Sequence, residues 1–241
     1  MNANSVPGLE MRADRLATFD FWESYTQSPL YQGELEPIKK WIRGTVLDVA
    51  SDYGRFSVLS SSSVSVDIER KFLLRGADLG NISHAVAASG LALPFKDRTF
   101  ETVLAMGIID HVPIGLTPRL LDELTRVATD SGTVVIHVTS PHSPLAVVNH
   151  RNYGDYLHPY SPSVLRRQMR ARGWETTGTL SSGLAGWMSL LPYTVKSYVP
   201  WSVHVTLAFR LRTAEATEPS RSSVSSAYSG RAATPPATRP P

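Results

Sequence analysis

The chain has 241 residues, of which 42% are hydrophobic, 19% are charged and none is cysteine. This size and composition fit one ordinary domain with a continuous buried core. The absence of cysteine excludes a disulfide scaffold, a thiolate metal site and a cysteine nucleophile. The formal net charge is +3, and four arginines against two glutamates at 211–241 account for most of it. The rest of the chain is nearly neutral, so we expect no nucleic-acid partner.

The two ends of the chain differ in composition from its middle. Apolar side chains at helical spacings over 9–43, interrupted at Ser28-Pro29 and Gly33, predict two short helices in an N-terminal helical cap, 1–43. Residues 211–241 are rich in Ser, Thr, Pro and Arg, which predicts a disordered tail. No stretch has the apolar run of a signal peptide or a membrane span. We therefore expect a cytoplasmic protein with its functional domain at 44–210.

Short β-branched runs alternate with helical patterns from Thr45 onward. Near-continuous apolar runs are typical of strands buried on both faces. An amphipathic pattern after 116 predicts a helix that ends near Gly132, and Ser161 is a plausible N-cap for a second helix. The alternation predicts an α/β fold with an open, mainly parallel sheet, whose ligand crevice lies at the carboxyl ends of the strands. The seven expected strands are 46–50, 64–68, 84–88, 102–107, 133–139, 174–180 and 202–211.

The segment after the first expected strand has the composition of a ligand-binding turn. Small residues at 50–54 lead from the strand into Arg55, and such a turn lets a nucleotide-like ligand lie against backbone N–H groups. Nineteen residues after Asp48, the second strand ends in Asp67, whose carboxylate can accept both hydroxyls of a ribose. Two ordinary turns capped by aspartates would contain the same residues, so either turn alone leaves both interpretations open.

Four stretches in order resemble the motifs of the class I S-adenosylmethionine-dependent methyltransferases. They read VLDVASDYGRF (46–56), VDIER (66–70), LALPFKDRTFETVLAMGIIDHV (91–112) and LLDELTRVATDSGTVVIHV (120–138). The resemblance covers about residues 40–180. It implies a Rossmann-like methyltransferase sheet with helices on both faces, S-adenosyl-L-methionine as the cofactor, and methyl transfer to a small-molecule or biosynthetic-intermediate acceptor.

The resemblance also implies positions for the cofactor. Its methionine part would lie against Asp48 and the 50–54 turn, and Asp67 would hold the ribose hydroxyls. The base would lie against Ile68, and the sulfonium near the end of the fourth strand. The implied cofactor-binding residues are Asp48, Ala50, Asp52, Gly54, Asp67, Ile68, Ser89, Gly90, Leu91, Met106 and Gly107.

The chain departs from the family pattern at three of these positions. Ala50 and Asp52 replace glycines of the turn, and Ser89 replaces the aspartate that usually precedes the LPF string. Alanine adds a methyl group where ligand and backbone approach closely, and a carboxylate at Asp52 attracts the sulfonium of the cofactor and repels its carboxylate. The departures leave open a catalytically inactive, methyltransferase-like binding subunit. A nicotinamide dehydrogenase is a further alternative, disfavoured because its GxGxxG motif is absent.

Asp110 and His111 occupy the place of a Glu-His pair that the family often carries, which makes them the implied catalytic residues. His111 is the better general base because the ordinary pKa of histidine is near neutrality, and a pocket-lining or structural histidine is the alternative. The loop 153–160 resembles the segment that closes over the acceptor in related enzymes. An ordered surface loop is the alternative there.

Two further features have weaker functional readings. Four histidines have spacings that match no compact metal-ligand motif, so we expect no metal. The apolar, aromatic run 184–209 predicts a hairpin with its connector, and a membrane-surface or lipid contact is the alternative. Nothing in the sequence indicates the oligomeric state. The four histidines are His137, His142, His150 and His158.

Overall fold

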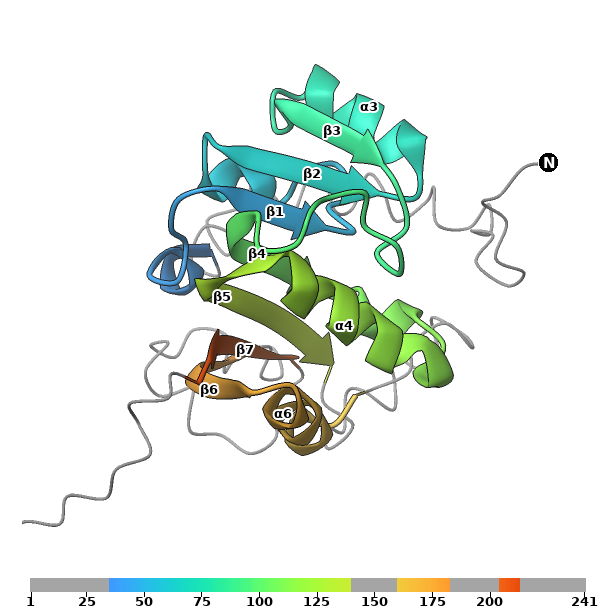
Figure 1. Ribbon diagram of the computed structural model, residues 1–241. Coiled ribbons are helices and arrows are strands. Elements are labelled where there is room, and N and C mark those ends of the chain that lie inside the picture. The colour runs from blue at the N-terminus through green and yellow to red at the C-terminus, as the bar shows by residue number, and fades with distance from the viewer. Residues whose placement is uncertain (1–34, 140–159, 183–203, 213–241) are drawn as a thin grey trace, which may run out of the picture. The chain divides into compact units, whose positions relative to one another are not determined.

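The computed structural model describes residues 35–139, 160–182 and 204–212 (Figure 1). The described elements up to Leu211 belong to one compact unit, and Arg212 begins a second one. Most of the expected N-terminal cap, the loop 153–159 and most of the run 184–203 lie outside the described residues, as does the tail beyond Arg212. Of the cap, residues 35–43 are described, and residues 35–39 are helical.

Seven strands form a single sheet in the order β3-β2-β1-β4-β5-β7-β6. The pairs among β1 to β5 are parallel, and β7 runs antiparallel to both of its neighbours. The carboxyl ends of β1, β2, β3 and β5 therefore meet at one edge, where their arrowheads point the same way in Figure 1. This confirms the predicted seven-stranded, mainly parallel sheet. The strands are β1 (Val46–Val49), β2 (Ser63–Asp67), β3 (His84–Ala87), β4 (Phe100–Met106), β5 (Ala128–Thr139), β6 (Trp174–Ser182) and β7 (His204–Leu211).

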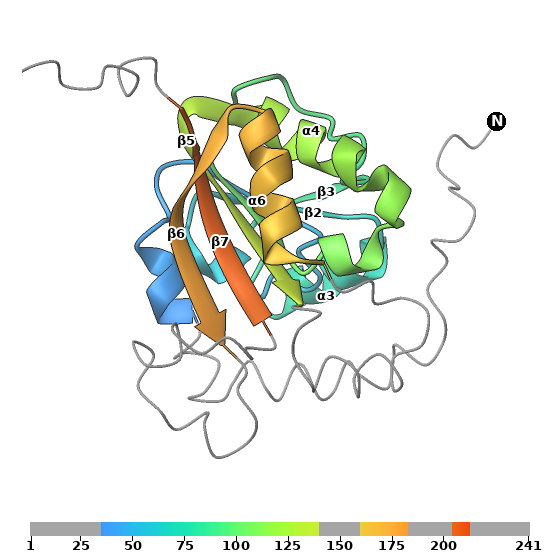
Figure 2. The ribbon, with the colours of Figure 1, turned by 90° about the horizontal axis from the view of Figure 1, so that it is seen from below.

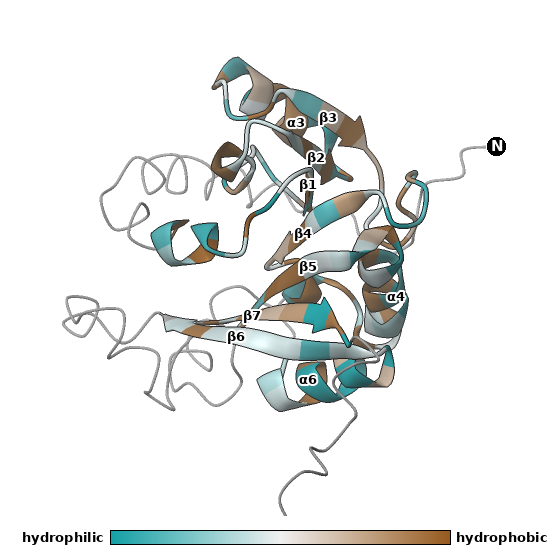
Figure 3. Cartoon of the chain, turned by 60° about the vertical axis from the view of Figure 1, so that its left-hand side comes forward, coloured by the Kyte–Doolittle hydropathy of each residue, from teal (hydrophilic) through white to brown (hydrophobic). Residues whose placement is uncertain are grey.

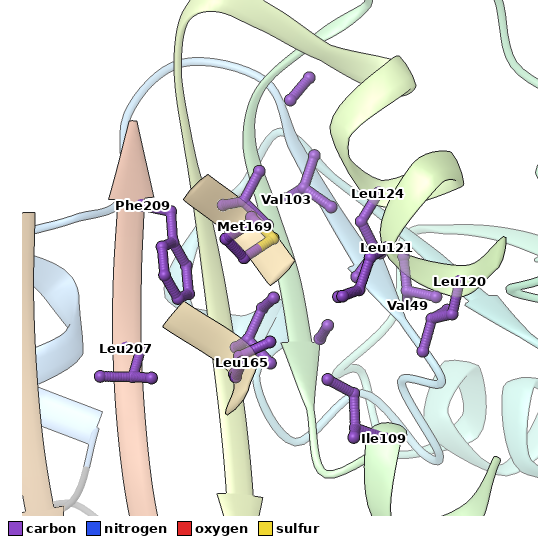
Figure 4. Close-up of a cluster of buried hydrophobic side chains, with 14 of the residues drawn as sticks. Val49, Val103, Ile109, Leu120, Leu121, Leu124, Leu165, Met169, Leu207 and Phe209 are labelled. Carbon is purple, nitrogen blue, oxygen red and sulfur yellow. The ribbon is translucent and has the colours of Figure 1, made fainter. Parts of the chain in front are cut away.

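Helices cover both faces of this sheet. Helices α4 (Thr117–Val127) and α6 (Pro162–Ala171) pack on one face, where their leucines meet inward side chains of β4, β5 and β7 (Figure 4). On the other face, Ile38 and Trp41 pack against Val46 and Leu104. Figure 2 shows α4 and α6 on one side of the sheet and residues 35–39 on the other. Helix α3 (Arg70–Asp78) joins β2 to β3 and packs against both strands.

The edge strand β6 packs against Trp41 through a glycine. It is mostly pale in Figure 3, whereas β7 beside it is largely brown. The pairing of β6 with β7 is irregular between Thr176 and Gly178. A Cβ atom at Gly178 would lie 2.4 Å from Cζ2 of Trp41, so only glycine lets the indole pack against this strand.

The first connection in the sheet is unusually short. Between β1 and β2 the described chain forms a single 3-10 turn, Ser57–Leu59, in place of a full helix. The spacing from Phe56 to Val64 predicts a helix of only one or two turns, and the structure confirms this. Polar side chains, described below, fill the space beneath it.

The prediction that the helix after 116 continues to Gly132 is wrong. Helix α4 ends at Val127, and the next residue, Ala128, already pairs with Phe100 of β4. Gly132 lies inside β5, where an added Cβ would come 2.9 Å from the Thr129 Oγ1 atom. The glycine therefore permits a close approach within the strand and does not cap the helix.

No helix among the described residues is both long enough and apolar enough to cross a membrane.

Helix α6 begins where the sequence predicts it. Ser161 occupies the N-cap position with an extended backbone, but its side chain does not cap the helix. Its hydroxyl pairs instead with the hydroxyl of Ser163 at 2.8 Å. Tyr160, just before it, donates its backbone N–H to the carbonyl of Thr139 at the end of β5, at 3.1 Å. The start of α6 is thereby fixed at the carboxyl edge of the sheet.

Candidate functional site

The chain leaves β1 through a turn in which three residues have a left-handed backbone. The φ angles are 57° at Ala50, 55° at Asp52 and 81° at Gly54. A left-handed backbone costs an ordinary L-residue about 1–2 kcal/mol, while aspartate tolerates it better than most. The turn therefore keeps the course of a glycine-rich turn although only Gly54 remains a glycine. An added Cβ at Gly54 would also lie 2.5 Å from Cγ1 of Ile82.

Asp67, at the end of β2, holds this turn in place. Its Oδ2 accepts the backbone N–H of Asp52 at 2.9 Å, and its Oδ1 accepts the N–H of Glu69 at 2.8 Å. The backbone of Ser51 also bonds to Val66 of β2 at 3.0 Å. Burial raises the pKa of Asp67 to about 6, against the opposing effect of these two hydrogen bonds. Each carboxylate oxygen keeps a further lone pair that can accept a hydroxyl.

Asp48, on β1 just before the turn, lies in a buried polar cluster. Its Oδ2 accepts the hydroxyl of Ser57 at 2.8 Å, and Ser57 Oγ lies 2.6 Å from Ser65 Oγ. The other carboxylate oxygen, Oδ1, is buried and has no hydrogen-bond partner among the described residues, and the same holds for Ser51 Oγ. Burial raises the pKa of Asp48 to about 7. Two buried oxygen atoms at the base of the turn thus remain for a ligand or a water to satisfy.

An apolar surface lies next to Asp67. Ile68 exposes 44% of its surface, which is unusual for a large hydrophobic side chain in this structure. An apolar group bound beside the Asp67 carboxylate could cover such a side chain. Asp67 and Ile68 thus place hydrogen-bond acceptors next to an apolar surface.

The residues after β3 form a turn at the same edge of the sheet. The hydroxyl of Ser89 accepts the N–H of Leu91 at 3.2 Å, and the Ser89 carbonyl accepts the N–H of Ala92 at 3.0 Å. At Gly90 an added Cβ would lie 2.8 Å from Ile108 Cδ1 and 3.1 Å from Val49 Cγ1. The turn at 89–91 therefore packs against the ends of β1 and β4.

Strand β4 ends in Met106, which is buried, and Gly107, which has a φ of 96°. Nothing lies within 4 Å of an added Cβ at Gly107, so the backbone angle and not the space favours glycine there. In the sheet, Met106 is beside His137 of β5, whose Nδ1 lies 2.9 Å from Thr206 Oγ1 of β7.

Among the described residues no cluster of three or more histidine and carboxylate side chains is placed to hold a metal.

The structure separates Asp110 from His111. Asp110 is 2% exposed, and its Oδ2 accepts both the N–H of Thr139, at 2.9 Å, and its hydroxyl, at 2.8 Å. Burial raises the pKa of Asp110 to about 7. His111 ends a 3-10 turn directly after β4 and is exposed. Asp110 therefore ties the ends of β4 and β5 together, while His111 lies at the solvent-accessible edge.

One pair of residues in this region was not singled out by the sequence reasoning. Arg126 of α4 donates to the carbonyls of Leu93, at 3.0 Å, and Phe95, at 2.8 Å, and pairs with Glu123. Glu123 in turn accepts the N–H of Leu93 at 2.7 Å. The LPF string is thus held by α4 and has a structural role. Glu123 and Arg126, which are three residues apart in the 120–138 stretch, could have indicated this ion pair from the sequence.

Residues 45–136 match the model of a methyltransferase domain. An uncharacterised protein of Methanocaldococcus jannaschii is 27% identical over 104 residues, which span 41% of this chain and 42% of that protein. The chain thus spans less than half the length of this curated relative.

Solved structures of methyltransferases share the fold. A structure from Thermotoga maritima, described as an S-adenosylmethionine-dependent methyltransferase and possible histamine N-methyltransferase, has a TM-score of 0.68 at 19% identity, over 81% of this chain and 96% of that one. Magnesium protoporphyrin IX methyltransferase from Synechocystis, with bound S-adenosylhomocysteine, has a TM-score of 0.61 at 13% identity, over 82% and 95%. Residues 45–136 thus match a methyltransferase domain, and the chain has the fold of S-adenosylmethionine-dependent methyltransferases.

Proposed function

We propose that the protein transfers a methyl group to a small-molecule acceptor at the carboxyl edge of β1, β2 and β4. The observation that carries this proposal is the turn after β1. Ala50 and Asp52 hold left-handed backbone angles that glycine adopts more readily, and Asp67 pins the turn from β2. Backbone strain that is kept by the surrounding structure is typical of functional sites.

The residues present fit S-adenosylmethionine. The buried Oδ1 atom of Asp48 and the hydroxyl of Ser51 can accept hydrogen bonds from the amino group of the methionine part, directly or through a water. Asp67 retains acceptor positions for ribose hydroxyls, and Ile68 offers apolar surface to the base. When bound, this cofactor supplies a methyl group activated by the positive charge on its sulfur.

We assign the two candidate catalytic residues different roles. His111 is exposed at the end of β4 and takes the proton of an acceptor that must lose one. Asp110 acts as a positioning residue, because its bonded carboxylate oxygen is occupied by Thr139 and the side chain is buried. For an acceptor that carries no such proton, holding the two reacting atoms in line suffices.

The acceptor is proposed only as a class. The two structural neighbours described above carry the names of unlike acceptors, histamine and a magnesium porphyrin, on one fold. Function is set by the site and not by the fold. The near-neutral body of the chain favours a small molecule over a nucleic acid as the acceptor.

Calorimetric titration with S-adenosylmethionine and with S-adenosylhomocysteine tests the proposal. We expect the wild-type protein to bind both, and Asp67→Ala to bind both about a hundredfold more weakly, because two hydrogen bonds to a carboxylate are lost. Asp130→Ala is the matched control, since Asp130 is exposed near the opposite end of β5. A wild-type protein that binds neither ligand would overturn the proposal in favour of a non-catalytic binding subunit.

A further inference from the structure

The turn after β1 ends at a glycine whose conformation depends on contacts from outside the turn. Gly54 has a φ of 81°, and a glycine has no Cβ atom to resist a rotation of the peptide group before it. Ala50 and Asp52 share the left-handed backbone but carry a Cβ atom, which leaves them fewer alternative conformations. The peptide group before Gly54 is therefore the part of the turn that most needs to be held.

This peptide group, between Tyr53 and Gly54, is bonded at both ends. The Gly54 N–H donates to the carbonyl of Ser51 at 2.9 Å, and the Tyr53 carbonyl accepts from Nδ2 of Asn81 at 3.2 Å. A rotation of the peptide group would break both hydrogen bonds. Asn81 is thereby linked to Ser51, whose buried hydroxyl has no hydrogen-bond partner among the described residues and can accept from a ligand.

The end of α3 carries Asn81 to this position. The Gly76 carbonyl accepts the N–H groups of Asn81, at 2.9 Å, and of Ile82, at 3.2 Å. An added Cβ at Gly76 would lie 2.7 Å from the Tyr53 carbonyl oxygen and closer still to Ile82 Cδ1, so a glycine is needed for α3 to approach the turn. The backbone of α3 and the side chain of Asn81 thus support the turn together.

We propose that Asn81 is a positioning residue for the amino-acid part of S-adenosylmethionine, acting through the peptide group before Gly54. The inference rests on the proposed function, in which the methionine part lies against this turn. The nucleoside part lies instead against Asp67 and Ile68, whereas the hydrogen bonds of Asn81 go to Gly76 and Tyr53. Loss of the Asn81 amide should therefore weaken binding of the amino-acid part and leave binding of the nucleoside nearly unchanged.

Two ligands separate these parts in calorimetric titrations. S-adenosylhomocysteine contains both parts, while 5′-methylthioadenosine keeps the nucleoside and the sulfur but lacks the amino-acid end. In Asn81→Ala we expect S-adenosylhomocysteine to bind about five- to tenfold more weakly, the typical effect of one hydrogen bond, and 5′-methylthioadenosine to change less than about twofold. Asn81→Asp keeps the shape of the side chain, but its ionised carboxylate has no donor for the Tyr53 carbonyl, so we expect the same selective loss.

Gly178→Ala is the control for a loss of stability alone, because β6 and β3 are the opposite edges of the sheet. Measured where every variant is folded, it should leave both affinities unchanged. Loss of S-adenosylhomocysteine affinity in both Asn81 variants, without an equal loss for 5′-methylthioadenosine, supports the assignment. Unchanged S-adenosylhomocysteine affinity in either Asn81 variant, or equal losses for the two ligands, would overturn this inference and leave the proposed function intact. A wild-type protein that binds neither ligand would overturn both.

Discussion

Ala50→Gly should stabilise the protein, although glycine usually destabilises a folded chain. Ala50 has a φ of 57°, a backbone angle that costs an alanine about 1–2 kcal/mol. Glycine adopts this angle freely but loses about 0.5–1 kcal/mol more conformational entropy on folding. The difference predicts a net gain of about 0.5–1 kcal/mol. For a chain of this size, that corresponds to a rise in melting temperature of about 1–4 °C.

Thermal and urea unfolding of the ligand-free protein measure this effect. Ala85→Gly in β3 is the matched control, because Ala85 is exposed in a strand and is not among the residues with positive φ. The control should lose about 0.5–1 kcal/mol through chain entropy alone. If Ala50→Gly lowered the stability as much as the control does, the strained turn would be refuted, and with it the main structural support for the binding site.

Two further predictions concern packing around the site. Arg126→Ala should destabilise the protein by about 2–3 kcal/mol, because the carbonyls of Leu93 and Phe95 lose their donor. Asp97→Asn removes only an exposed partner of that arginine and should cost less than about 1 kcal/mol. Equal losses in urea unfolding would argue against a structural role for the two carbonyl contacts. Gly178→Ala should cost about 1–3 kcal/mol, since its Cβ would overlap the Trp41 ring, and an unchanged melting temperature would show that the indole packs elsewhere.

The sheet was largely readable from the sequence because its signal is local. Buried parallel strands appear as apolar runs, and each of the seven expected runs corresponds to a strand within a few residues. The end of α4 was not readable. Thr129, Asp130 and Ser131 resemble the polar end of a helix. The helix ends before them because Ala128 pairs with Phe100 of β4, and the sequence does not show this contact between distant residues.

The candidate site was predictable in position and less so in its bonding. Asp48, Asp67 and Asp110 stand at strand ends, which places them at one edge of the sheet. Their partners are not visible in the sequence. Asp67 bonds to the turn fifteen residues earlier, and Asp110 bonds to a residue twenty-nine positions later. Register across the sheet decides both contacts, so a one-dimensional pattern does not reveal them.

Asp110 gives the stability a pH dependence of unusual sign. Its pKa is raised to about 7 by burial, against an ordinary value of about 4 in an unfolded chain. The folded protein therefore binds this proton more tightly than the unfolded chain. The contribution to stability is complete below the unfolded pKa and is lost as the pH rises through the folded pKa. Asp110→Asn keeps an oxygen for Thr139 but does not ionise, so it escapes this loss.

We expect the stability of Asp110→Asn relative to the wild type to be greater at pH 8 than at pH 5, by on the order of 3 kcal/mol. Urea unfolding of the ligand-free protein at both pH values measures the difference. Asp48 and Asp67 contribute with the same sign in both proteins, so the comparison isolates Asp110. Asp130→Asn, at an exposed carboxylate, should keep the wild-type pH dependence. Parallel pH profiles for Asp110→Asn and the wild type would mean that burial does not hold this carboxyl protonated, because the two would then differ by a constant.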